Sequence, residues 1–152
     1  MTLLTGVLLI YLDVSAVTYE DNTITLPASF MPGSYKISFE DEVYSGLLLT
    51  VLVDSGLSES DVSFDGTTIQ IAGDTGLTAA EYIANISSVT VNGEAVSGKG
   101  LSSVLFTEDG SLNLEAQTSK DDTKVDIFPV GGSYEVTLES TGFPTVTFTV
   151  EN

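Results

Sequence analysis

The 152-residue chain contains no cysteine, histidine, tryptophan or arginine. Without cysteine there is neither a disulfide framework nor thiolate chemistry. Without histidine the chain lacks the usual general base and the commonest metal ligand, which excludes Ser–His and Cys–His nucleophile systems. A pair of carboxylates could still act in a glycosidase-like hydrolase, but no catalytic motif is present. We therefore expect no enzyme and no catalytic residues.

Positive charge is also scarce, because 4 lysines stand against 22 acidic residues and give a net charge of -18. Nucleic-acid phosphate and anionic membrane surfaces both require a cationic face, so neither is expected as a partner. The simplest interpretation is that this charge keeps the protein soluble, because like-charged molecules repel one another. A basic partner, divalent cations or a salty medium are the more specific explanations.

No apolar run is long enough to cross a bilayer. The longest candidate, residues 3–12, has about ten residues, against the roughly 20 that a membrane helix needs, and no positive segment precedes it. We interpret it as folded structure rather than as a signal peptide. The chain is then either a piece of a larger secreted protein or a protein that reaches the outside by assembly into a virus particle.

Strand patterns are abundant instead. Hydrophobic residues make up 42% of the chain, which is enough for a core, and short runs alternate apolar and polar residues with period two, as in 35–39 and 134–138. This alternation is typical of an antiparallel sandwich with one buried face. One short helix is expected in 77–85, where Thr78 and Glu81 have the capping-box spacing.

Three Asn-Gly or Asp-Gly pairs predict two-residue hairpin turns. They are Asp65-Gly66, Asn92-Gly93 and Asp109-Gly110. Each pair adopts positive φ angles at little cost, as the type I′ turn requires.

An internal repeat organises the chain. The segment 33–53 recurs without a gap as 132–152, with identical Gly-Ser-Tyr openings and matching apolar positions. We predict an all-β fold of two Ig-like antiparallel β-sandwich units with one short helix. The expected division is an N-terminal β-unit at 1–53, a linker and hairpin at 54–76, and a C-terminal Ig-like sandwich at 77–152.

Two tyrosines, Tyr35 and Tyr134, occupy equivalent places in the repeat. A binding aromatic is one interpretation, but we favour a core tyrosine whose hydroxyl donates to a loop carbonyl, as in a tyrosine corner.

The N-terminal unit lacks the opening strands of its counterpart, which would leave an exposed sheet edge. Either the 61–72 hairpin or another chain would complete it by strand addition. Oligomerisation or assembly follows from the second alternative. The interface candidates are Leu8, Ile10, Leu47, Leu49 and Val51.

Acidic residues gather in the loop that contains Asp121, Asp122 and Asp126. Calcium prefers oxygen ligands from such loops, but the spacing is not that of an EF-hand and Lys120 and Lys124 interrupt the group. We favour a solvated loop, with calcium as the alternative, and expect no other cofactor. A second acidic group, Glu59, Asp61 and Asp65, has the same two interpretations.

The C-terminal half resembles a known family. Its features are Val89-Thr90-Val91-Asn92-Gly93, then 132–138 (GSYEVTL), then Thr141-Gly142-Phe143 before the terminal 145–150. This order resembles the haem- or haemoglobin-interacting Ig-like module of Shr-type surface receptors in Gram-positive bacteria. The resemblance implies the fold for residues 80–150. It also raises the expectation of haem binding. Tyrosine would then be the only candidate iron ligand inside the matched segment.

We expect a non-enzymatic structural or binding module on an exterior surface, with a protein partner, either itself or a coat or surface protein. The favoured version is a phage virion component, a capsid decoration or tail-associated protein on the virion surface. The alternative is an excised module of a Gram-positive cell-surface receptor or adhesin, extracellular or in the cell wall, that contacts haem or haemoglobin. A carboxylate-dependent hydrolase is the third class.

Overall fold

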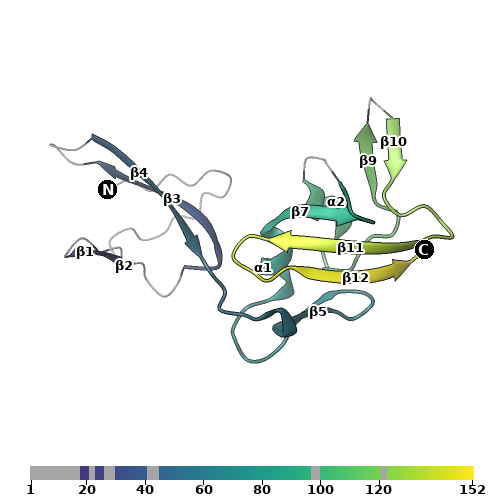
Figure 1. The fold of residues 1–152 in the computed structure, drawn as a ribbon, viewed down its shortest axis with the longest axis horizontal. Coiled ribbons are helices and arrows are strands. Elements are labelled where there is room, and N and C mark those ends of the chain that lie inside the picture. The colour runs from purple at the N-terminus through teal and green to yellow at the C-terminus, as the bar shows by residue number, and fades with distance from the viewer. Residues whose placement is uncertain (1–17, 21–22, 26–29, 41–44, 97–99, 121–122) are drawn as a thin grey trace. The chain divides into compact units, whose positions relative to one another are not determined.

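The computed structural model describes residues 18–20, 23–25, 30–40, 45–96, 100–120 and 123–152. The chain divides into two compact units, Met1–Ser55 and Gly56–Asn152 (Figure 1). The strand-rich content confirms the all-β class. No helix among the described residues has the length and apolar character needed to cross a membrane.

The N-terminal unit contains two antiparallel hairpins. The first joins β1 (Thr18–Glu20) to β2 (Thr23–Thr25), and the second joins β3 (Gly33–Glu40) to β4 (Ser45–Val53). The longer hairpin pairs Tyr35 with Val51. The bend between its strands, 41–44, lies outside the described residues.

The C-terminal unit is built around one four-stranded antiparallel sheet in the order β12-β11-β7-β8 (Figure 1). Two-stranded hairpins, β5–β6 and β9–β10, accompany it. Its elements are the short 3-10 helix η2 (Glu59–Asp61), β5 (Val62–Phe64), β6 (Ile69–Ile71), α1 (Ala79–Ala84), β7 (Ile86–Val91), β8 (Glu94–Ala95), α2 (Leu101–Leu105), β9 (Gln117–Lys120), β10 (Thr123–Asp126), β11 (Ser133–Ser140) and β12 (Val146–Glu151).

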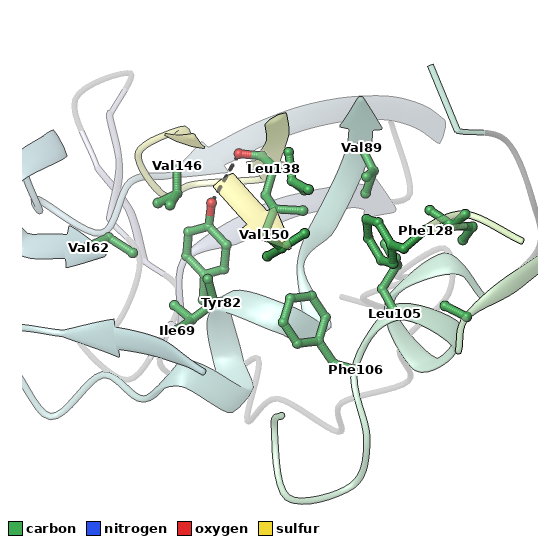
Figure 2. Close-up of a cluster of buried hydrophobic side chains, with 13 residues drawn as sticks. Val62, Ile69, Tyr82, Val89, Leu105, Phe106, Phe128, Leu138, Val146 and Val150 are labelled. Carbon is green, nitrogen blue, oxygen red and sulfur yellow. Dashed lines mark hydrogen bonds between the residues drawn. The ribbon is translucent and has the colours of Figure 1, made fainter. Parts of the chain in front are cut away.

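The core of this unit forms where the inward faces of the strands meet the helices (Figure 2). Along β11, Val136, Leu138 and Ser140 are buried and alternate with more exposed residues, as a half-buried strand requires. Tyr82 from α1 and Leu105 from α2 are fully buried against this face. The helices therefore cover the sheet, and apolar burial holds the unit together.

The two long hairpins pair in the same register. Tyr35 faces Val51 in one and Tyr134 faces Val150 in the other, which are equivalent positions of the repeated segment. In the C-terminal unit β7 adds to the other side of β11, with Val136 opposite Val91. Two complete Ig-like sandwiches are not confirmed, because the described strands form one four-stranded sheet and several two-stranded ones.

The predicted turns have different outcomes. Asn92 and Gly93 have φ angles of 51° and 79° and connect β7 directly to β8, as predicted for a two-residue turn. Asp65-Gly66 does lie in a hairpin, but the loop extends to Thr68 because the Asp65 carboxylate accepts hydrogen bonds from the backbone N–H groups of Thr67 and Thr68. Asp109-Gly110 forms a turn after α2, not a turn between two long strands.

The helix content requires a correction. The expected helix is present as α1, but α2 is a second one, so the prediction of a single short helix is wrong. Leu101, Val104 and Leu105 have the i, i+3, i+4 spacing of a helix face, and this face packs into the core. The helix begins at Leu101, and the residue before it, Gly100, has a left-handed φ of 65° and no side chain to cap the helix. The usual start signal was therefore missing.

Candidate functional site

An open groove of about 820 Å³ lies between α1 and α2 in the C-terminal unit. We call it the α1–α2 groove. It is lined by α1, by residues 68–70 at the start of β6, by Ser102 and Ser103 of α2 with Phe106 after it, and by the turn 107–110. More of its lining is apolar than polar, which is typical of a binding surface.

The floor and walls of the groove come from different elements. Ile69 and Phe106 form the floor and are only 1% and 3% exposed. Both belong to the buried cluster that Figure 2 shows. Ala80 and Ala84 are exposed on one face of α1, because residues four apart in a helix lie one above the other. Ser103 lies on the opposite wall. The small side chains on both walls leave the space open.

The turn 107–110 forms one end of the groove and carries its acidic residues, Glu108 and Asp109. The Asp109 carboxylate accepts hydrogen bonds from the Thr107 hydroxyl and from the Ser111 backbone N–H. These hydrogen bonds lower the pKa of Asp109, the one from the Thr107 hydroxyl most. Asp109 therefore keeps its negative charge even in mildly acidic solution.

A second, smaller groove of about 440 Å³ lies between β5 and β12. Phe64 and Phe148 line it and stack on each other, with ring centroids 4.0 Å apart. Glu59 is the one acidic residue in its lining. Much of its aromatic surface is used to join the β5–β6 hairpin to the main sheet.

The predicted structural tyrosines both donate to carbonyls earlier in the chain. The Tyr35 hydroxyl donates to the Met31 carbonyl at 2.7 Å, and the Tyr134 hydroxyl donates to the Pro129 carbonyl at 2.5 Å. The Tyr134 ring also lies over Gly132, where an added Cβ would collide with the tyrosine ring and its oxygen. Only glycine leaves room for this ring.

Tyr82 has a different environment. It is fully buried, and its hydroxyl lies 3.1 Å from the Leu138 carbonyl oxygen (Figure 2). The same hydroxyl lies 3.1 Å from the Pro144 carbonyl oxygen. Burial raises the pKa of Tyr82 to about 12. The sequence pattern predicts only that Tyr82 lies on the apolar side of a helix, because its polar partners are far away along the chain.

The candidate calcium residues are not brought together in the described structure. Asp121 and Asp122 lie outside the described residues, and Asp126 is exposed and accepts a hydrogen bond from the Gln117 amide at 2.6 Å. Asp61 caps η2 through Ser58, and Asp65 closes its own loop. Within the described ranges, no group of three acidic side chains could hold a metal ion.

The interface candidates lie in the N-terminal unit. Leu8 and Ile10 fall outside the described residues. Leu47, Leu49 and Val51 lie on β4, and Val51 is half-buried. Assembly through this unit stays a prediction. The 61–72 hairpin belongs to the C-terminal unit, where β5 and β6 contribute Val62 and Ile69 to the core.

The α1–α2 groove was not predicted from the sequence. Its residues come from segments as far apart as 68 and 110, and no motif connects them. The one available signal was the alternation of small and apolar residues in Ala79-Ala80-Glu81-Tyr82-Ile83-Ala84. That pattern indicates a helix with one small-residue face, but not what lies opposite.

Comparison with known proteins gives one match. The family model described as "Heme-binding protein Shr-like, Hb-interacting domain" matches residues 58–151. No curated protein matches the chain significantly, and no solved structure does either. The matched residues lie within the C-terminal unit, which also contains both grooves.

Proposed function

The chain belongs to the family of Hb-interacting domains of Shr-like haem-binding proteins, and from this membership we propose that it is a haemoglobin-binding module of a Gram-positive surface protein. Its location would then be extracellular or in the cell wall. The module acts by binding a protein partner and carries out no reaction.

The observation that supports this proposal best is the extent of the match. Residues 58–151 cover almost the whole of the compact unit Gly56–Asn152. This unit contains its own buried core, so the family resemblance applies to a complete folding unit and not to a single motif. An interaction surface on this unit is therefore positioned by a rigid scaffold.

The side chains of this unit are not suited to ligating haem iron. The matched segment has no histidine, cysteine or methionine, and its tyrosines are Tyr82 and Tyr134. Both hydroxyls already donate to backbone carbonyls, and Tyr82 is fully buried. Axial ligation of haem iron requires an accessible side chain of one of these four types. We infer that the module binds the globin protein and does not ligate the haem iron.

The phage virion interpretation receives no support from the comparisons. It depended on the resemblance of Ig-like repeats to virion proteins, which is an argument from fold alone. The family match favours the surface-receptor alternative instead.

Haemoglobin binding can be measured directly with the full chain by isothermal titration calorimetry. We expect saturable binding to haemoglobin. A basic protein such as lysozyme is the control, because a chain with a net charge of -18 attracts cations non-specifically. In a parallel haem titration we expect no shift of the Soret band. Equal binding to lysozyme and haemoglobin, or no binding to haemoglobin, would refute the proposal.

A further inference from the structure

We propose that the α1–α2 groove is the docking surface for haemoglobin, and that it receives a segment of the globin that presents a lysine or arginine beside an apolar side chain. This inference rests on the proposed function and adds the location of the contact and the chemistry of the partner. It is supported by the apolar α1 wall of the groove, its charge and the hydrogen bonds that hold its rim in place.

The apolar part of the partner would contact the α1 wall. Ile83 is half-buried and provides apolar surface in the groove, with Ala80 and Ala84 exposed beside it. Because alanine side chains extend no further than Cβ, a partner side chain can approach the helix closely and cover this surface. Covering it removes apolar area from water and stabilises the complex by about 25 cal/mol per Å² before the costs of association.

The cationic part of the partner would lie at the turn. Glu108 is exposed and Asp109 carries a charge held in place by hydrogen bonds. No lysine belongs to the groove lining. The groove thus has one apolar end and one anionic end, and the field of a chain with net charge -18 also attracts a cationic segment.

Backbone hydrogen bonds hold the rim of the groove in place. Thr107 N donates to Ser111 O and Gly110 N donates to Thr107 O, both at 2.9 Å. The turn is also joined to the β5–β6 loop, because Leu112 N donates to Thr67 O at 2.8 Å. A preorganised rim loses little conformational entropy when a partner binds.

The groove between β5 and β12 fits this role less well. Its volume is about 440 Å³ against about 820 Å³ for the α1–α2 groove. Its two phenylalanines already stack on each other, so less apolar surface is available to a partner. The α1–α2 groove is therefore the better candidate.

Two pairs of variants of the full chain test this inference by calorimetric titration with haemoglobin. Glu108→Lys reverses the charge in the groove, and Glu94→Lys makes the same change at the exposed end of β8. Ala80→Leu narrows the groove, and Ala95→Leu makes the same change on β8, outside the groove lining. We expect the groove variants to bind about tenfold more weakly, and each β8 control to bind within about twofold of the unaltered chain.

The thermal transition of each variant shows whether it has folded. As a second measurement that needs no variant, amide NMR spectra of the unaltered chain with haemoglobin should change first at residues 80–84 and 107–110. If both groove variants bind haemoglobin as tightly as the unaltered chain does, the groove is not the docking surface. The same conclusion follows if the spectral changes lie outside residues 80–84 and 107–110. If the unaltered chain does not bind haemoglobin, the proposed function itself is refuted and this inference with it.

Discussion

At the scale of single residues, Tyr82 connects the helix α1 to the sheet. Its hydroxyl bridges to Leu138 and Pro144, while its own carbonyl accepts a hydrogen bond from the buried Ser140 hydroxyl at 2.6 Å. Tyr82→Phe keeps the ring and removes the bridge. We expect a loss of about 1–3 kcal/mol in the free energy of unfolding, measured by urea titration. Tyr134→Phe is the comparison, and should cost less because that residue is only half-buried.

The raised pKa of Tyr82 predicts that the protein loses stability in alkaline solution. Folding raises the pKa of Tyr82 from 10.0 to about 12. A group with a raised folded-state pKa contributes stability that is complete below the unfolded pKa and is lost as the pH rises through the folded pKa. The free energy of unfolding should therefore fall between pH 10 and pH 12, and fall less steeply in Tyr82→Phe. Parallel pH profiles of the two proteins would contradict this assignment.

Asn92 combines a backbone conformation with a side-chain contact. Its φ of 51° is left-handed, and its side-chain oxygen accepts a hydrogen bond from Glu135 N at 2.9 Å. Asn92→Ala loses the contact and also strains the backbone, whereas Asn92→Gly loses only the contact. We expect the alanine variant to be less stable than the glycine variant by about 1 kcal/mol in thermal unfolding. Equal stabilities would show that the backbone conformation imposes no strain.

At the scale of elements, α1 depends on its capping box. Thr78 accepts a hydrogen bond from Glu81 N, and the Glu81 carboxylate accepts one from Thr78 N at 2.6 Å. A helix of six residues is too short to be stable by itself. Thr78→Ala should cost about 1 kcal/mol, as measured by urea unfolding. Glu81→Gln retains an acceptor and should cost less, so a larger loss in Glu81→Gln would contradict the capping role.

The two long hairpins also show how an element depends on its neighbours. Their sequences are similar and their registers are the same. The register is the same because the matching alternation of apolar residues fixes which residues pair. Among the described strands, only the C-terminal hairpin pairs with a third strand, β7, and belongs to a four-stranded sheet. The repeat predicts the hairpin, but the larger sheet requires a strand from elsewhere in the chain.

At the scale of the whole molecule, we expect the unit Gly56–Asn152 to fold by itself. The main buried cluster lies entirely within it, from Val62 to Val150. When expressed alone, this unit should show one cooperative thermal transition and haemoglobin affinity within about twofold of the full chain. A broad transition, or dispersed amide signals only in the full chain, would show that the N-terminal unit is needed for folding.

The strand-rich class, the start of α1 and the Asn92-Gly93 turn could all be predicted from the sequence, because they depend on local periodicity, capping and turn chemistry. The family resemblance was also visible there, because it rests on the order of short motifs along the chain. Tertiary structure alone decided that α2 is helical, that Tyr82 bridges α1 to the sheet, and that α1 and α2 enclose a groove. The physical reason is that burial and long-range hydrogen bonds depend on which distant segments meet. Local patterns contain little information about these contacts.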